Sequence, residues 1–210
     1  MNSTTVKRPY RSPLRKAQAD ATRQRVLDAG LALFAEAGYP GTSVAAIARA
    51  AGVAPETIYA SVGSKRGIIN ALLAQVDAER GPERYRQRID ERGGAPSVTL
   101  EVLAEGAARF WQRHGVLVGV LRNGVGDPEI GEAWVERQQA RRELIRAAID
   151  TWPRGSLRGG LGPDRAADIA WAVTSDEAYS LLVGLRGWST QEFIDWAAQT
   201  MIRELLAEPS

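Results

Sequence analysis

The sequence predicts an all-α protein in two parts: an N-terminal three-helix domain with a helix-turn-helix, and a larger C-terminal helical domain. Three observations predict this class. Apolar residues recur at helical spacing along most of the 210 residues, no segment shows the sustained alternation of a strand, and glycine or proline falls at the breaks. We expect an arm over residues 1–16, the first domain over 17–64 and the second over 65–207.

Composition narrows the class of protein. With 44% hydrophobic and 25% charged residues, the chain resembles an ordinary globular protein. It has no cysteine, which excludes disulfides, thiolate zinc sites and cysteine nucleophiles and agrees with a reducing compartment. No apolar run is long enough to span a bilayer, and the polar, basic N-terminus has no apolar segment behind it. We therefore expect a cytoplasmic protein without a membrane partner.

The net charge of +2 is unevenly distributed. Residues 1–66 hold ten Lys/Arg against four Asp/Glu, whereas the remaining residues hold 17 against 21. Residues 1–16 are basic, contain Pro9 and Pro13, and lack apolar periodicity, so we interpret them as a flexible basic arm. A basic first third indicates a polyanionic partner, and a solvated charged tail is the alternative.

The first predicted helix covers about residues 17–37. One of its faces carries apolar or small residues at helical spacing: Val26, Gly30, Leu33, Phe34 and Ala37. We expect the helix to end at Gly38, because a glycine readily adopts the left-handed conformation that closes a helix. Residues 39–41 then form a turn.

Three further N-terminal helices are predicted over 44–51, 55–61 and 65–79. Thr42 or Ser43 can cap the first of these, and Gly52 ends it. Pro55 suits the opening turn of the next helix, because proline has no N–H to leave unpaired there. Ser64 can cap the last.

The C-terminal part contains a charged, Gly- and Pro-containing connector with some helix over residues 83–96. Helices are then predicted over 97–113, 115–124, 128–150, 164–186 and 190–207. Breaks are expected at 124–128, 153–163 and 187–189, where glycine, proline and serine interrupt the apolar periodicity.

Residues 42–65 carry the strongest functional signal. Two short helices that cross steeply need a small contact residue and a left-handed turn residue, which Ala48 and Gly52 supply. Apolar residues must face the shared core, and these are Ile47, Ala51, Val53 and Ile58. This packing leaves one face of the 55–61 helix exposed and available to a DNA major groove.

The exposed positions have the chemistry of a groove reader. Hydroxyls and small apolar groups can contact base edges and thymine methyls, Glu56 can accept from cytosine or sit on the positive helix end, and Tyr59 can donate to a phosphate. Lys65 adds its ammonium to free backbone N–H groups at a helix start, which favours phosphate. The predicted DNA-binding residues are Thr42, Ser43, Pro55, Glu56, Thr57, Tyr59, Ala60, Ser61 and Lys65.

These residues resemble the DNA-binding domain of TetR-family repressors. The resemblance rests on Gly41-Thr42-Ser43-Val44-Ala45-Ala46-Ile47-Ala48, Gly52-Val53, Thr57-Ile58-Tyr59 and Ser64-Lys65, preceded by Phe34-Ala35-Glu36-Ala37-Gly38-Tyr39. It covers residues 20–75 without a gap. Two features depart from the family pattern. Ala60, Ser61 and Val62 replace bulkier residues, and Ala54 stands where the family has a serine cap.

More loosely, residues 171–196 resemble a subgroup of the family that is frequent in actinobacteria, through Thr174-Ser175-Asp176-Glu177-Ala178-Tyr179 and Arg186-Gly187-Trp188-Ser189. The resemblance implies a homodimer through the last two helices and an effector pocket among the 97–150 helices. It further implies a repressor that binds double-stranded DNA at a near-palindromic operator and is released by a small lipophilic or aromatic effector. Activation instead of repression stays open.

Residues with aromatic or polar side chains are the candidates for the effector pocket. Tryptophans are usually core residues, and of the six we favour Trp111 and Trp134 as pocket residues. His114, the single histidine, is more simply interpreted as a cap or turn residue near Gly115. Residues 136–143 are more simply a solvated charged face, although an inward arginine could hold an anion. The ligand-binding candidates are Trp111, His114, Trp134, Arg137, Gln138, Arg141, Trp171, Ser175 and Tyr179.

The sequence gives no support for catalysis, a metal or a cofactor. The carboxylate pairs Glu101/Glu105 and Asp164/Asp168 have helical spacing, but without histidine or a cleft we expect them to be solvent-exposed. No phosphate-binding glycine loop, nucleophile elbow or dinucleotide fingerprint occurs. The alternatives are a helical small-molecule-binding or catalytic protein whose helix-turn-helix is architectural, and a sequence-tolerant DNA-packaging protein. Binding to the chain's own upstream DNA and to random DNA discriminates among the three.

Overall fold

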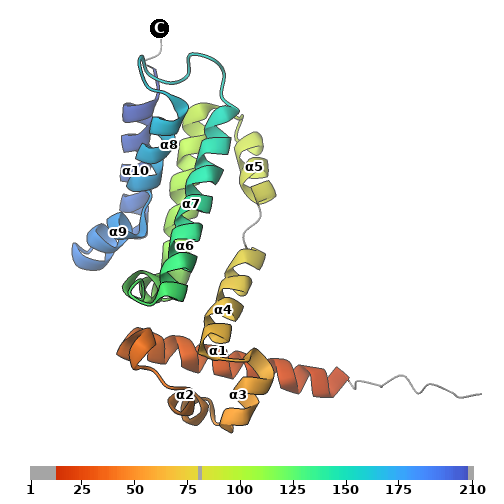
Figure 1. Ribbon diagram of the computed structural model, residues 1–210. Coiled ribbons are helices and arrows are strands. Elements are labelled where there is room, and N and C mark those ends of the chain that lie inside the picture. The colour runs from red at the N-terminus through yellow and green to blue at the C-terminus, as the bar shows by residue number, and fades with distance from the viewer. Residues whose placement is uncertain (1–12, 80–81, 208–210) are drawn as a thin grey trace, which may run out of the picture. The chain divides into compact units, whose positions relative to one another are not determined.

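The computed structural model describes residues 13–79 and 82–207 (Figure 1). They are helices joined by turns, with no β-strand in these two ranges and one isolated bridge between Leu157 and Leu206. The chain divides between Gln75 and Val76 into two compact units. We call them the N-terminal unit and the C-terminal unit. The division falls within the fourth helix, whereas the sequence-based boundary lies at the start of that helix.

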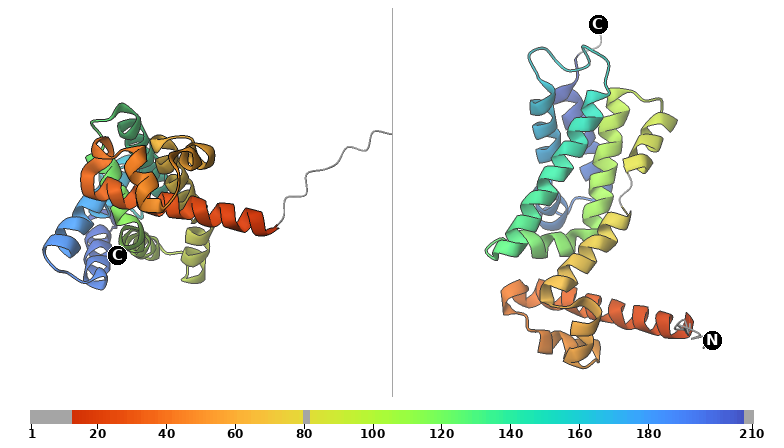
Figure 2. Two further views of the ribbon diagram at one scale, coloured as in Figure 1. Left: turned by 90° about the horizontal axis from the view of Figure 1, so that it is seen from below. Right: turned by 45° about the vertical axis from the view of Figure 1, so that its right-hand side comes forward.

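The N-terminal unit contains α1 (Pro13–Gly41), α2 (Val44–Ala51), α3 (Pro55–Val62) and the first part of α4 (Lys65–Glu79). Helix α1 begins earlier than expected, so residues 13–16 of the predicted arm are helical, and residues 1–12 lie outside the described residues. Its first half extends beyond the other helices of the unit (Figure 2). The sequence predicted the end of the helix at Gly38, which leaves the helical conformation at φ 74° and ψ 161°, but α1 resumes after this kink as far as Gly41.

Helix α1 packs on α2, α3 and the beginning of α4 through a core that includes Val26, Phe34, Ile47, Ile58 and Ile68. A Cβ at Gly30 would lie 2.8 Å from Cγ2 of Ile68, so glycine is needed for the close approach of α1 and α4. The predicted face of α1 is confirmed at Val26, Gly30 and Phe34, whereas Leu33 is half-buried and Ala37 is exposed.

The C-terminal unit contains, besides the end of α4, α5 (Pro82–Glu91), α6 (Pro96–Asn123), α7 (Pro128–Asp150), α8 (Pro163–Val173), α9 (Asp176–Tyr179), a π-helix (Ser180–Leu185) and α10 (Thr190–Leu205). Its core lies mainly where α6, α8 and α10 meet (Figure 1). Small residues such as Ala104, Ala167 and Ala197 are fully buried there and allow the helices to approach closely around Phe193 and Met201.

The connector over 83–96 contains the expected helix, which runs as far as Glu91. Two other sequence-based boundaries in this unit are wrong. The predicted helices over 97–113 and 115–124 are the single helix α6, because Gly115 is tolerated within a long packed helix. The predicted helix over 164–186 is broken at Thr174, where the buried hydroxyl donates to the carbonyl of Ala170 at 2.7 Å and Ser175 starts a new helix.

Within residues 13–79 and 82–207, every helix is too short or too polar to cross a membrane.

Candidate nucleic-acid interface and effector site

The turn between α2 and α3 fixes the exposed face of α3. Ser43 caps α2, its Oγ accepting from the N–H of Ala46 at 3.1 Å. Gly52 ends α2 with φ 66° and ψ 40°, a left-handed conformation that favours glycine. Helix α3 then begins at Pro55 without a side-chain cap, because Ala54 precedes it. Ile58 turns toward the core and is fully buried, which leaves the opposite side of α3 outward.

Six of the predicted DNA-binding residues lie on α3. Pro55, Glu56 and Ala60 are exposed, and 57% of Tyr59 is exposed despite its large apolar ring. Thr57 and Ser61 are half-buried, and the Ser61 hydroxyl donates to the carbonyl of Ile58 at 3.2 Å. Within the N-terminal unit this helix therefore presents a small, mixed polar and apolar surface of the kind that fits a groove.

Thr42 and Lys65 bond to their own chain, a role that the sequence did not indicate. Thr42 is buried, and its hydroxyl is 2.8 Å from the carbonyl oxygen of Gly38 and 3.1 Å from that of Leu33. The Lys65 ammonium donates to the carbonyl oxygens of Tyr39 at 2.6 Å and Thr42 at 3.2 Å. It also lies 4.2 Å from the centroid of the Tyr39 ring. An ammonium has three N–H donors, so this anchoring leaves room for a phosphate contact.

Sequence reasoning missed Arg23, which lies in the predicted first helix. Its guanidinium donates to the carbonyl oxygen of Ser61 near the end of α3. The two residues are 38 positions apart, so helical periodicity alone gave no signal for the contact. Arg23 stabilises the carboxyl end of α3 and brings positive charge close to the outward helix.

Four of the predicted ligand-binding residues meet between α6, α7 and α8. Arg141 is half-buried and donates to the carbonyl oxygens of Trp171 at 2.7 Å and Thr174 at 3.1 Å. Its guanidinium lies 5.6 Å from the Trp111 ring centroid and 5.5 Å from that of Trp171. Trp111 is buried and donates to Thr174 at 2.9 Å, while Trp171 donates to Gln138 at 3.2 Å. The solvated-face interpretation is therefore wrong for Arg141, whose acceptors belong to the chain itself.

The remaining candidates are not part of this cluster. Arg137 makes two 2.8 Å bonds to the carboxylate of Asp77. Ser175 caps α9 by accepting from Ala178 at 3.1 Å. The hydroxyl of Tyr179 is 3.2 Å from that of Thr190, and Trp134 is half-buried on α7. The structure thus gives Arg137, Ser175 and Tyr179 bonds within the chain.

A cavity of about 630 Å³ opens between the last residues of α4, α5 and α6. It includes His114, which lies within α6 and is half-buried with its ring 5.0 Å from that of Phe110, so the cap or turn interpretation is wrong. The described residues that line it are Val76, Arg84, Tyr85, Arg88, Gly106, Arg109, Phe110, Gln112, Arg113 and His114.

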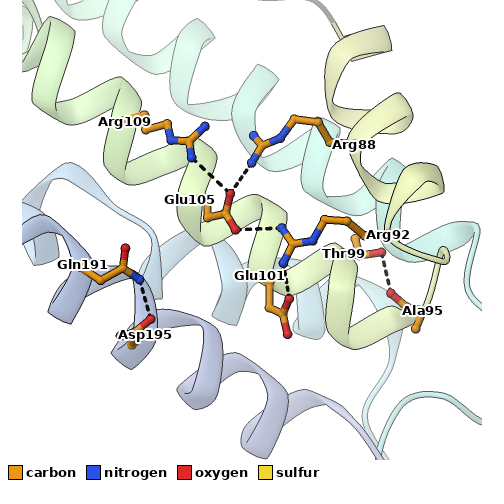
Figure 3. A network of polar contacts seen from close by, with 9 residues as sticks. All are labelled: Arg88, Arg92, Ala95, Thr99, Glu101, Glu105, Arg109, Gln191 and Asp195. Atoms are coloured by element: carbon orange, nitrogen blue, oxygen red, sulfur yellow. Dashed lines mark hydrogen bonds and ion pairs between the residues drawn. The ribbon is translucent and has the colours of Figure 1, made fainter.

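The expectation of solvent-exposed carboxylates at Glu101 and Glu105 is wrong. The Glu105 side chain is only 20% exposed and contacts Arg88, Arg92 and Arg109, with 2.8 Å to Arg92 (Figure 3). Glu101 shares Arg92 at 2.6 Å. Partial burial of Glu105 opposes its ionisation, but the hydrogen bond from Arg92 and the three positive charges lower its pKa. The network ties α5 and the residues after it to α6.

The other carboxylate pair holds α8 to α7. Asp168, 42% exposed, accepts from Arg142 at 2.6 Å, and Asp164, 73% exposed, accepts from Arg146 at 3.1 Å. The expectation of exposure is confirmed for Asp164, while the described residues contain no His/Cys/Asp/Glu cluster able to hold a metal ion.

Asp176 is a buried carboxylate that sequence reasoning left without a role. It forms a 2.8 Å ion pair with Arg122 of α6. Burial, a hydrogen bond to Glu177 and the charge of Glu177 together raise its pKa to about 6, against the opposing charge of Arg122. The two residues are 54 positions apart, so no local pattern indicated the pair.

A glycine-linked helix pair with an outward second helix, followed by a separate helical unit, defines a helix-turn-helix transcriptional regulator. Residues 26–72 match the family model described as bacterial regulatory proteins, tetR family. The match covers the helix-turn-helix, so the chain carries the DNA-binding domain of this family and is a helix-turn-helix transcriptional regulator.

Two relatives align with more than half of the chain. HTH-type transcriptional regulator UidR of Escherichia coli (strain K12) is 23% identical over 170 residues, 81% of this chain and 84% of UidR. The repressor BdcR of the same organism is 29% identical over 125 residues, 58% of this chain and 62% of BdcR.

Solved structures share the fold. NalD, the secondary repressor of the MexAB-OprM multidrug efflux pump in Pseudomonas aeruginosa, superposes with a TM-score of 0.75 at 23% identity, covering 92% of this chain and all of NalD. FadR of Bacillus subtilis, solved with stearoyl-CoA, gives a TM-score of 0.66 at 18% identity, covering 85% of this chain and 97% of FadR.

Proposed function

We propose that this regulator is a homodimeric repressor that binds a near-palindromic operator through its two α3 helices and is released by a small lipophilic or aromatic effector. The outward face of α3 carries this proposal. Tyr59 is 57% exposed while Ile58, the next residue back, is fully buried. An amphipathic helix of eight residues that begins with exposed Pro55 and Glu56 is suited to enter a major groove by its first turn.

In this arrangement the residues divide into two roles. The α3 residues Pro55, Thr57 and Ala60 face base edges and thymine methyls, which set sequence preference. Ser43 at the start of α2, Tyr59 and Lys65 contact phosphates, which set register. Lys65 does so from an ammonium that is already held by two carbonyl oxygens of the chain, and such pre-ordering lowers the entropic cost of the contact.

The proposed dimer forms through the last two helical segments, α8 to the π-helix and α10. Leu185 and Leu181 of the π-helix are 73% and 57% exposed, and large apolar residues that gather on a surface are typical of an interface. Two copies of α3 would then occupy successive major grooves on one side of the duplex, about 34 Å apart or a multiple of it.

Two similarities support the regulatory part. BdcR and NalD are described as repressors, and FadR was solved with a bound acyl thioester, stearoyl-CoA. We place the effector of this chain in the C-terminal unit, where it would favour one dimer state and change the separation of the two α3 helices.

The test is fluorescence anisotropy with labelled DNA from upstream of the chain's own gene, and with random DNA of the same length. We expect tighter, salt-dependent binding to the upstream DNA. Tyr59→Phe, which removes only the hydroxyl, should weaken binding about fivefold, in line with the loss of one hydrogen bond. The control is Thr151→Val, which removes an exposed hydroxyl after α7 in the C-terminal unit and should leave DNA affinity unchanged.

Three outcomes would contradict the proposal. Absence of salt-sensitive binding would favour a helical small-molecule-binding or catalytic protein with an architectural helix-turn-helix. Equal affinity for both DNAs would favour a packaging protein. Unchanged affinity in Tyr59→Phe would remove this residue from the interface.

A further inference from the structure

We propose that the cavity between the end of α4, α5 and α6 binds a small aromatic anion: a planar ring that carries a carboxylate, sulfonate or phosphate. The described lining of the cavity is positively charged. Among the described residues that line the cavity are four arginines and a histidine, but no aspartate or glutamate. A concave site with this lining attracts anions and repels cations.

Arg88 and Arg109 share their carboxylate partner with a further arginine. Glu105 contacts Arg88 and Arg109 and also accepts from Arg92, which in turn pairs with Glu101. Three guanidiniums therefore share two carboxylates (Figure 3). The network is therefore left with net positive charge beside the cavity. It also holds Arg88, which is 32% exposed, in a fixed position, and a preordered guanidinium binds an anion at a lower entropic cost.

Aromatic side chains line one wall of the cavity. Gly106, Phe110 and His114 are four residues apart along α6, so they follow one side of the helix, with Arg109 and Arg113 beside them. Tyr85 of α5 lies directly against Gly106, where an added Cβ would be 2.3 Å from Cε1 and 2.7 Å from the hydroxyl oxygen of Tyr85. A ring placed against this wall would bring an attached anionic group to the arginines.

The volume of the cavity suits a small molecule. About 630 Å³ lies within the roughly 300–1,000 Å³ typical of small-molecule sites. A flat basic surface would suit a nucleic-acid backbone, whereas a recess with aromatic sides suits a compact ligand. Arg109 is 65% exposed at the cavity, so the anionic group can be captured at its open side.

The cavity also touches α4, the helix that runs from the N-terminal unit into the C-terminal unit. Val76 of α4 lines it, and the adjacent Asp77 is held by two 2.8 Å bonds from Arg137 of α7. Helix α4 begins at Lys65 in the N-terminal unit. A ligand that contacts Val76 would therefore act on α4, and this regulatory consequence, unlike binding itself, rests on the proposed function.

The test compares two fluorescent probes that differ by one charged group. 8-Anilinonaphthalene-1-sulfonate is an aromatic anion, and N-phenyl-1-naphthylamine is its uncharged counterpart. We expect the full chain to bind the sulfonate, more weakly as salt is raised. In the double variant Arg84→Gln/Arg113→Gln its affinity should fall about tenfold or more, while affinity for the uncharged probe should change less than about twofold.

The matched control is Arg86→Gln, on the same helix as Arg84. Its side chain is 70% exposed, pairs with Glu83 at 3.2 Å and does not line the cavity, so sulfonate affinity should stay at the parental value. Gly106→Ala is a second test variant, because the new methyl must displace the Tyr85 ring from the wall of the cavity. It should weaken binding of both probes.

Parental sulfonate affinity in both the double variant and Gly106→Ala would overturn the inference, as would an equal loss for both probes in a folded double variant. Circular dichroism establishes folding. Operator anisotropy separates the two proposals. Sulfonate binding that needs these arginines, in a chain that ignores DNA, would refute the proposed function alone. Operator binding without arginine-dependent sulfonate binding would refute this inference alone.

Discussion

The two units use polar residues in opposite ways. In the N-terminal unit, polar and small side chains remain on the outer face of α3, and Tyr59 is 57% exposed. In the C-terminal unit, comparable side chains turn toward the chain: Arg141 bonds to Trp171 and Thr174, and Asp176 pairs with Arg122. An exposed polar side chain on α3 is therefore available to a partner, whereas a polar residue between packed helices more often satisfies its own backbone, as Thr42 also does.

The largest effect is expected from Arg141→Met, which keeps an unbranched apolar side chain but removes all of the donors. The carbonyl oxygens of Trp171 and Thr174 would lose charged partners, which should lower the free energy of unfolding by about 3 kcal/mol. Urea denaturation followed by tryptophan fluorescence measures it. Arg141→Lys keeps the charge and should lower the free energy of unfolding by less than Arg141→Met does. If Arg141→Met is as stable as the parent, the cluster is not structural and Arg141 becomes a stronger ligand candidate.

A smaller effect, with opposite signs in the two units, is expected from Gly→Ala. Gly52 has φ 66° and no atom near an added Cβ, so Gly52→Ala should cost about 1 kcal/mol from backbone conformation alone. Gly115 lies within α6, also with open space around it, and Gly115→Ala should stabilise by about 0.5–1 kcal/mol. Thermal denaturation measures both. If both substitutions changed the stability in the same direction, the turn after α2 would not need its left-handed residue.

The smallest effect concerns pH. The pKa of Asp176 is raised to about 6 in the fold, so between about pH 4 and 6 the folded state binds more protons than the unfolded state. This residue therefore contributes less stability as pH rises through that window. The free energy of unfolding of Asp176→Asn, measured relative to that of the parent, should rise by on the order of 1 kcal/mol from pH 4.5 to 7. Denaturation at both pH values tests this; a constant difference would mean that Asp176 stays ionised.

Glu105 provides the contrasting control for that experiment. Its pKa is lowered by the three arginines, so its stabilising contribution is present above the unfolded-state pKa and is lost as pH falls through the folded-state value. Glu105→Gln should therefore lose stability relative to the parent as pH rises from acid to neutral. The two substitutions should thus shift pH dependence in opposite directions.

Features fixed by neighbouring residues could be predicted from the sequence. Ser43, Gly52 and Ser64 act within three or four residues of themselves, and the structure confirms their capping or turn roles. Contacts between distant residues could not be predicted: Arg141 meets Thr174 across 33 positions, and Arg88 meets Glu105 across 17. The break at Thr174 was missed because it depends on hydroxyl bonds and not on glycine or proline.

The arrangement of Lys65 has a mechanical consequence. Its ammonium joins the first turn of α4 to the carbonyl oxygens that follow the kink of α1, and Gln75 bonds to Gln24 at 2.8 Å farther along the same pair of helices. These bonds at both ends resist rotation of α4 against α1. Under the proposed function, a movement of α4 would therefore carry α1, α2 and α3 together, and α3 would change position while keeping its shape.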